Sequence, residues 1–157
     1  MTRLVAVALL MVLARGALAC SCAFPEGTLE EKVRGSFETA AAVVLARAES
    51  ISEAQLPSPF GGADSLRLPG EITHFSEIRS WKGSHGKQFY TRIVTACCMC
   101  GKSFSEGDTY LLYLYGPDDE GFYGASTCSR TSEQSRIEKG ELEALDRIAA
   151  ELAEQKE

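Results

Sequence analysis

The stretch DTYLLYLY, residues 108–115, is the most strongly β-prone part of this chain. Its tyrosines, threonine and leucines suit a pleated strand, and Gly116-Pro117 directly after it is a turn signal. Similar short patterns recur on both sides, each bounded by turn residues. Five short strands of this kind predict a mainly β fold, a small antiparallel barrel or sandwich. The expected strands are 41–51, 71–81, 88–95, 108–115 and 122–128.

Two helices are expected to flank these strands. Residues 28–37 read as a short helix, with Thr28 as its N-cap and acidic residues in its first turn. Apolar residues recur at helical spacing from Ser135 to Glu154, which predicts an amphipathic C-terminal helix lying against the barrel. Residues 52–70 contain three prolines and three glycines, and we expect a long exposed loop there.

Residues 1–19 have the pattern of an export signal peptide. A basic start precedes the apolar run 4–13, which is too short to span a bilayer, and Ala17-x-Ala19 supplies the small residues of a cleavage site. Cleavage there would make Cys20 the first residue of a secreted or periplasmic protein. A lipoprotein signal, which would leave a lipid anchor on Cys20, is the alternative. No later stretch is long enough to cross a membrane as a helix, so we expect no transmembrane segment after processing.

The 138 residues that remain of the 157 are enough for one domain with a single core. The chain has 16 basic and 22 acidic residues, and loss of Arg3 and Arg15 with the signal leaves 14 against 22, a net charge of −8. Such an acidic protein is a poor partner for nucleic acid or anionic membranes. We expect a monomer without a cofactor of its own. We expect no enzymatic activity, because no catalytic triad, carboxylate pair or phosphate loop is recognisable, and His74 and His85 lack metal-ligating companions.

Six cysteines follow the predicted cleavage site. An even number in an oxidising compartment favours three disulfides, with fifteen possible connectivities. In an extended arm, residues two apart such as the first two cysteines point to the same face. Cys97-x-x-Cys100 also has the spacing of redox and zinc motifs, but no βαβ pattern surrounds it and no matching second pair exists. Disulfide formation is the favoured use of the six, which are Cys20, Cys22, Cys97, Cys98, Cys100 and Cys128.

Four stretches in a characteristic order span nearly all of residues 20–131. They are Cys20-Ser21-Cys22, Phe37-x-x-Ala40 followed by Val43-Val44-x-Ala46-Arg47-Ala48, Trp81-Lys82-Gly83, and Cys100-Gly101-x-x-Phe104-x-x-Gly107-x-x-Tyr110-Leu111 followed by Thr127-Cys128-Ser129. In these stretches the chain resembles the tissue inhibitors of metalloproteinases, specifically the N-terminal netrin-like domain as it occurs in bacterial-type relatives. The resemblance implies a five-stranded OB-like (netrin-like) barrel over residues 20–131 with flanking helices, and a helix within residues 132–157 packed on it.

The resemblance also implies two disulfides, Cys20–Cys100 and Cys22–Cys128. It leaves Cys97 and Cys98 without counterparts, because the family's third disulfide in this domain has no equivalent here. These two neighbours could form a strained vicinal bridge, stay free, or compete with Cys100 for Cys20.

The function implied by the resemblance is inhibition of a zinc metalloendopeptidase of the metzincin type. The α-amino nitrogen and carbonyl oxygen of Cys20 would chelate the zinc of the target protease. Ser21 would enter its main specificity pocket, and the residues after it would lie in the cleft. An α-amino group has a pKa of roughly 7.7–8.0, so a neutral fraction exists to bind the open position of a catalytic zinc. The implied protease-binding residues are Cys20, Ser21, Cys22, Ala23, Phe24 and Pro25.

Two other functions stay open at the level of the sequence, because a fold does not by itself define an activity. One is a non-inhibitory extracytoplasmic OB-fold binding module that uses the 52–70 loop. The other is a thiol-redox protein that uses Cys97 and Cys100.

Overall fold

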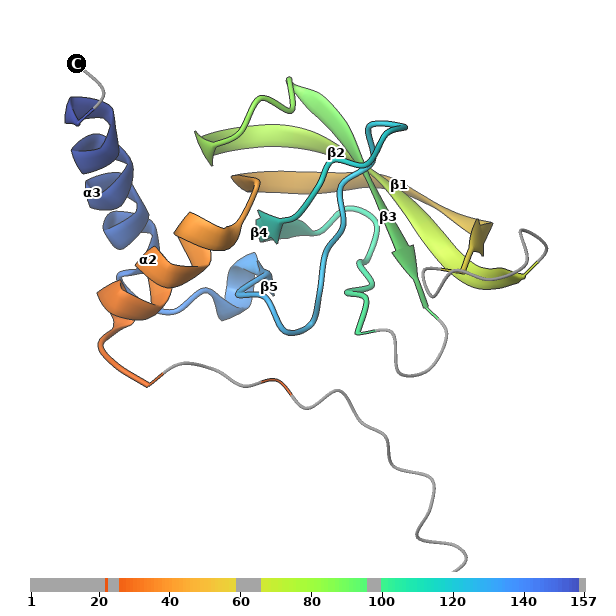
Figure 1. Ribbon diagram of the computed structural model, residues 1–157, viewed down its shortest axis with the longest axis horizontal. Coiled ribbons are helices and arrows are strands. Elements are labelled where there is room, and N and C mark those ends of the chain that lie inside the picture. The colour runs from red at the N-terminus through yellow and green to blue at the C-terminus, as the bar shows by residue number, and fades with distance from the viewer. Residues whose placement is uncertain (1–21, 23–25, 59–65, 96–99, 156–157) are drawn as a thin grey trace, which may run out of the picture.

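The protein is mainly β, with a single five-stranded antiparallel sheet and two α-helices beside it (Figure 1). The computed structural model describes residues 22, 26–58, 66–95 and 100–155. The sheet order is β3-β2-β1-β4-β5. This architecture confirms the predicted β-rich, OB-like fold with flanking helices. The elements are α2 (Leu29–Thr39), β1 (Ala42–Pro57), β2 (Arg67–Lys82), β3 (Gln88–Val94), β4 (Thr109–Leu114), β5 (Ser132–Glu133), the 3₁₀ turn η2 (Gln134–Arg136) and α3 (Glu141–Glu154).

The sheet does not close into a continuous barrel. Single bridges join Tyr123 to Thr91 of β3 in parallel and Gly124 to Tyr115 beyond β4 in antiparallel fashion. The predicted strand over 122–128 is therefore wrong as a regular strand. Its backbone follows a turn in which the Asp118 carboxylate accepts the N–H groups of residues 120 and 122. The fifth strand of the sheet is instead the short β5.

The predicted exposed loop over 52–70 is also wrong where the structure describes it. Residues 52–57 continue β1 and pair with 67–72 of β2 in one long antiparallel hairpin. Gly70 lies within this ladder. A Cβ there would collide with the Leu56 side chain and lie 2.5 Å from the Ile93 carbonyl oxygen. This glycine allows close strand packing rather than marking a loop. Residues 59–65 lie outside the described part.

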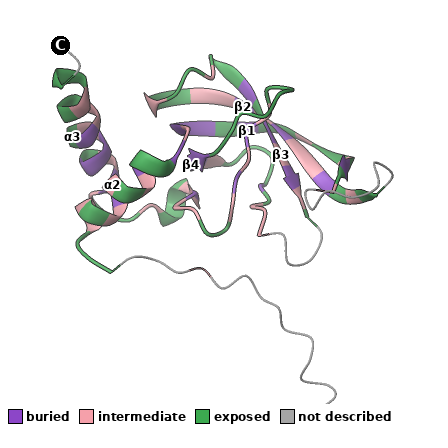
Figure 2. Cartoon of the chain, in the orientation of Figure 1, coloured by how far each residue is buried: buried purple, intermediate pink, exposed green. Residues whose placement is uncertain are grey.

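Buried residues lie on both faces of the sheet, and Figure 2 shows them along the strand centres and on the inner sides of the helices. On β1, Val44, Ala46 and Ala48 contribute to one core cluster with Phe75 and Phe89. The alternate β1 residues face the helices in a second cluster. A central strand buried on both faces requires the nearly continuous apolar run found at the start of β1. The second cluster has as its buried members Val33, Phe37, Ala40, Val43, Leu45, Leu111, Tyr113, Ala144, Leu145 and Ile148.

The helix α2 begins as predicted. Thr28 and Glu31 form a reciprocal capping box, in which each side chain accepts the backbone N–H of the other residue. The helix α3 starts later than the predicted Ser135, because Gly140 adopts a left-handed conformation with φ of 91° and separates it from η2. The ion pairs Arg34–Glu151 and Arg147–Glu30 join the two helices and show that they run in the same direction. None of the described helices is long and apolar enough to cross a membrane.

Candidate functional site

Cys22 is the one predicted protease-binding residue that the structure describes. It forms a disulfide with Cys128, and the two Cα atoms lie 5.1 Å apart. The bridge closes a separation of 106 residues and joins the N-terminal segment to the body of the fold. This is the pairing that the family resemblance implied. The other five predicted residues, Cys20, Ser21, Ala23, Phe24 and Pro25, lie outside the described part of the chain.

Cys128 is held by a compact hydrogen-bonded turn. Its N–H donates to Ser126 Oγ at 3.0 Å, and the Ser129 N–H and Oγ both donate to the Ser126 carbonyl oxygen. Ser129 Oγ also lies 2.9 Å from Thr131 Oγ1, which accepts the N–H of Tyr113 in β4 at 2.9 Å. The turn is thus linked through Thr131 to the centre of the sheet. Such a turn presents its disulfide on a fixed backbone.

The segment around Cys100 lies directly beside this turn. The Thr127 N–H donates to the Cys100 carbonyl oxygen at 2.9 Å, Gly101 bridges Ser126, and the Lys102 N–H donates to Ala125. Cys100 is itself disulfide-bonded. The implied Cys20–Cys100 pairing includes a residue outside the described part and stays a prediction, as do the states of Cys97 and Cys98. The fold nevertheless brings residues 100–102 and 125–128 side by side.

The backbone of Cys100 and Gly101 allows this segment to lie close to the end of β3. Cys100 has a left-handed φ of 51°, a conformation that few non-glycine residues adopt. At Gly101, a Cβ would lie 2.7 Å from the Val94 carbonyl oxygen at the end of β3. A side chain at this glycine would push the segment away from β3. We name the Cys22–Cys128 disulfide together with residues 100–102 and 125–128 the anchor.

A buried charged group lies behind the anchor. Glu141 is 2% exposed, and its carboxylate accepts hydrogen bonds from Tyr113 Oη at 2.9 Å and from Arg130 Nε at 2.9 Å and Nη2 at 3.0 Å. Burial, followed by the charge of Glu141, raises the pKa of the Tyr113 phenol. Hydrogen bonding to Glu141 raises the pKa of the Arg130 guanidinium despite its partial burial. These contacts fix the chain just after Cys128 against α3.

Sequence reasoning did not find this charged group. Arg130 and Glu141 are eleven residues apart, with β5 and η2 between them. Periodicity applies within one element and cannot pair residues across such a connection. Acidic residues in a first helical turn are also ordinary features of solvent-exposed helices. No local signal distinguishes Glu141 from the exposed Glu143 in the same turn.

Each of the two histidines packs against an aromatic side chain. His85 lies against the Phe89 ring at 4.9 Å, with Nδ1 2.8 Å from the Gly86 carbonyl oxygen and Nε2 3.1 Å from Ser80 Oγ. His74 stacks on Tyr90 with ring centroids 4.8 Å apart. Among the described residues, no group of three or more His, Cys, Asp and Glu side chains could hold a metal ion.

A comparison with models of protein families finds no match to this chain, and a search of curated proteins likewise finds none.

Proposed function

We propose that the protein is a secreted inhibitor of zinc metalloendopeptidases, similar in mode to the tissue inhibitors of metalloproteinases. The observation that carries this proposal is the Cys22–Cys128 disulfide. It attaches the segment that begins at the predicted mature residue Cys20 to the hydrogen-bonded turn over residues 126–129. A terminus held in this way suits insertion into a protease cleft.

The chemistry of the proposed inhibition resides in the backbone of Cys20. Its α-amino nitrogen and carbonyl oxygen would form a five-membered chelate with the catalytic zinc and displace the bound water. Catalytic zinc sites keep one such position open. The amine must be unprotonated to donate its lone pair, and its usual pKa of roughly 7.7–8.0 leaves a usable neutral fraction near pH 7.

The side chains after Cys20 would supply the remaining contacts. Ser21 is small and polar, so it would enter pockets of different size without a clash. Cys22 to Pro25 would follow the cleft in the manner of an uncleaved peptide. Cys22 is covalently held, so the ordering cost of binding, roughly 0.5–1.5 kcal/mol per immobilised side chain, is reduced before the protease is met.

The disulfide state of Cys100 supports the same proposal. Cys100 is disulfide-bonded, and its carbonyl accepts from Thr127 next to Cys128. A Cys20–Cys100 bridge would give the terminus a second attachment within the anchor. Two attachments flanking Ser21 would present its side chain away from the body, because alternate residues of an extended segment point to opposite faces.

The test compares two forms of the mature chain that differ at the terminus alone. One begins at Cys20 with a free amine, verified by intact mass, and the other carries one additional alanine before Cys20. We expect the first to inhibit hydrolysis of a fluorogenic peptide by at least one member of a metzincin panel. The extended form should be at least about a hundredfold weaker, because its amine is displaced from the zinc.

The control is the thermal unfolding of both forms, which should coincide because the added residue lies outside the core. Lack of inhibition at micromolar concentration by the verified Cys20 form would contradict the proposal. Equal inhibition by the extended form would contradict the chelation mechanism.

A further inference from the structure

Two glutamates lie directly opposite one another in the β1–β2 hairpin. The register pairs Glu53 of β1 with Glu71 of β2, and residues paired in this way have Cβ atoms roughly 4.5–5.5 Å apart on one face of the sheet. Like charges in this arrangement repel each other. Within residues 26–58, 66–95 and 100–155, no lysine, arginine or histidine forms an ion pair with either carboxylate.

Two threonine hydroxyls lie beside this acidic pair on the same face of the sheet. Thr73 follows Glu71 by two residues in β2, so both side chains point to one face. The register places Thr73 directly opposite Thr91 of β3. Both threonines are 0% exposed, and neither Oγ1 atom has a hydrogen-bond partner. Buried hydroxyls without a partner are unfavourable and rare in native proteins, so each one requires an explanation.

The carboxylate of Glu71 connects these hydroxyls to the opposite glutamate. Its Oε2 atom is also buried and also lacks a hydrogen-bond partner. Three of the five buried side-chain atoms without a partner in the described chain therefore belong to these adjoining positions. The residue opposite Glu71 in β3, Ile93, belongs to the core, whereas Glu53 is exposed. The four oxygen-bearing side chains thus extend from the core to the solvent, which leaves an ion a path to them.

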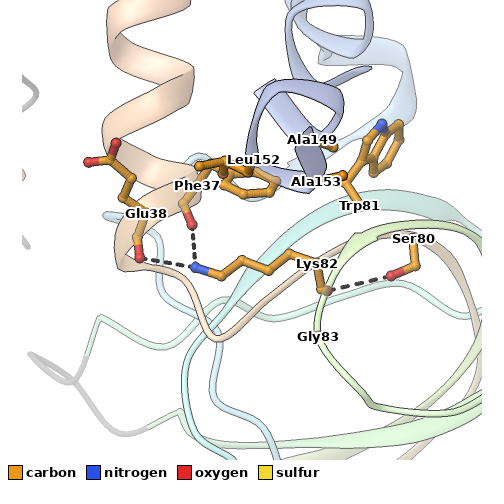
Figure 3. A pocket seen from close by; sticks show the side chains of 9 residues that line it. All are labelled: Phe37, Glu38, Ser80, Trp81, Lys82, Gly83, Ala149, Leu152 and Ala153. Atoms are coloured by element: carbon orange, nitrogen blue, oxygen red, sulfur yellow. Dashed lines mark hydrogen bonds between the residues drawn. The ribbon is translucent and has the colours of Figure 1, made fainter. Parts of the chain in front are cut away.

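The groove of about 610 Å³ beside Trp81, lined by residues of α2, β2 and α3, shows the opposite situation (Figure 3). Lys82 Nζ donates to the carbonyl oxygens of Phe37 at 2.8 Å and Glu38 at 3.0 Å. Trp81 Nε1–H donates to Asp146 Oδ1 at 2.6 Å. None of the residues that line this groove contributes a buried polar atom without a partner. The unsatisfied oxygens of β2 and β3 are therefore the better indication of a ligand.

The donor set has the chemistry of a calcium site. Carboxylate and hydroxyl oxygens suit hard cations, and the absence of cysteine and histidine disfavours zinc. Two carboxylates balance the charge of one divalent ion. Ca²⁺ accepts six to eight oxygens in a flexible geometry, whereas Mg²⁺ demands a near-ideal octahedron and releases its waters reluctantly. Side chains from three strands that are open to solvent on one side suit the more adaptable ion, with water completing its coordination.

We propose that Glu53, Glu71, Thr73 and Thr91 form a calcium-binding site at the end of the core face of the sheet. The ion would lie between the two carboxylates and accept lone pairs from the buried hydroxyls. It would replace the repulsion across the hairpin by attraction and satisfy the orphaned oxygens. Because the set has two carboxylates, we expect the weak affinity of extracellular calcium modules, with a Kd on the order of 10⁻⁴–10⁻³ M. The inference is independent of the proposed inhibition, which uses the segment after Cys20.

The test titrates CaCl₂ into the oxidised mature chain after divalent ions have been removed with a chelator. Calorimetry should detect one saturable site in the stated range, and MgCl₂ should bind at least roughly tenfold more weakly. Calcium that binds only the native state stabilises it. About 10 mM CaCl₂ should therefore raise the unfolding temperature by about 3 °C or more over NaCl of equal ionic strength.

Four variants locate the site. Glu53→Gln and Glu71→Gln should each weaken calcium binding by roughly tenfold or more. The matched control is Glu49→Gln, the same change at an exposed glutamate of β1 that has no partner in the register, and it should bind calcium like the parent protein. Thr91→Val removes a hydroxyl but keeps the branched shape, and it should weaken binding by roughly threefold or more.

Unfolding without calcium separates this role from a purely structural one. Glu53→Gln removes the repulsion, so the metal-free variant should unfold about 1–3 °C above the metal-free parent. The order should reverse in about 10 mM CaCl₂. The proposal is overturned if calorimetry detects no saturable calcium binding, if Mg²⁺ binds as tightly, or if Glu71→Gln and Glu49→Gln bind calcium alike.

Discussion

Arg130 and Glu141 form a two-point ion pair where the chain after Cys128 meets the first turn of α3. Arg130 Nε lies 2.9 Å from Oε1 and Nη2 lies 3.0 Å from Oε2 of the carboxylate. Glu141 is almost fully buried, and Tyr113 Oη is its other close partner. A carboxylate in such a place keeps its charge only when it is paired and hydrogen-bonded. The pair therefore determines how β4, the anchor and α3 fit together.

Arg130→Met should lower the free energy of unfolding by about 3 kcal/mol, because it leaves the Glu141 carboxylate buried without its cation. Urea unfolding of the oxidised protein measures this. The matched control is Arg136→Met, which removes an exposed guanidinium 4.0 Å from Glu133 and should change stability by no more than about 0.5 kcal/mol. Equal losses in the two variants would show that the Glu141 site tolerates an unpaired charge.

The stability of the protein should fall at alkaline pH through Tyr113. Burial raises the pKa of its phenol above the unfolded value of about 10. The unfolded state therefore binds fewer protons than the native state above that pH. The stabilisation from neutral Tyr113 is complete below about pH 10 and is lost as the pH rises further toward the folded value.

Tyr113→Phe removes this titration and should make the fall in unfolding free energy above about pH 10 shallower. At neutral pH the variant should be about 1–2 kcal/mol less stable, because Glu141 loses one hydrogen-bond donor. Tyr90→Phe, at an exposed tyrosine, is the control and should keep the parent slope. Indistinguishable slopes for the Tyr113 variant and the parent would refute the assignment.

Two glycines should respond to alanine with opposite signs. In α2, Gly35 has no atom within 4 Å of a built Cβ, so Gly35→Ala should stabilise the protein by about 0.5–1 kcal/mol through helix propensity. Gly70→Ala should destabilise it by about 1–3 kcal/mol, because its Cβ would strike Leu56 and the Ile93 carbonyl. Thermal unfolding of the two variants beside the parent protein measures both changes in stability. A stabilising Gly70→Ala would mean that the β1–β2 hairpin is more loosely packed than described.

Removal of the anchor disulfide should affect both stability and the proposed inhibition. The double variant Cys22→Ser/Cys128→Ser opens a covalent loop between cysteines 106 positions apart and should lose about 2–4 kcal/mol of stability. With the Cys20 amine intact, inhibition of a sensitive protease should weaken by roughly tenfold or more, because the arm is no longer held before binding. Calorimetry and an inhibition titration provide the two readouts. Unchanged inhibition would show that the bridge is not needed to present the terminus.

The sequence predicted most of the regular elements because their signals are local. Residues 88–95 are rich in aromatic and β-branched side chains, with Phe89, Thr91 and Ile93 on one face, and the structure has β3 at Gln88–Val94. The capping residue Thr28 likewise marked the start of α2. The prediction of an exposed loop over 52–70 was wrong because proline and glycine usually interrupt regular secondary structure. In the structure, the pairing of β1 with β2 in a hairpin determines the conformation of this region.

Less of the candidate site than of the fold could be predicted from the sequence. Spacing alone left fifteen disulfide connectivities, and the Cys22–Cys128 pairing came from the family resemblance. The stretch 122–128 looked like a strand, yet the structure pairs it only through single bridges, and the ring of Tyr115 covers Gly124. The groove beside Trp81 has no sequence signature, because it arises where the ends of three separate elements meet.

The pairing of α2 with α3 has a consequence for the order in which the protein matures. Arg34 and Glu151 are 117 positions apart and become neighbours only when nearly the whole chain is available. A chain that emerges from its N-terminus displays the apolar side of α2, with Val33 and Phe37, before the segment that covers it has arrived. The Cys22–Cys128 bond likewise waits for the second cysteine. The domain therefore completes its packing late. Its N-terminal segment is cross-linked to the body only after nearly all of the remaining chain has been synthesised.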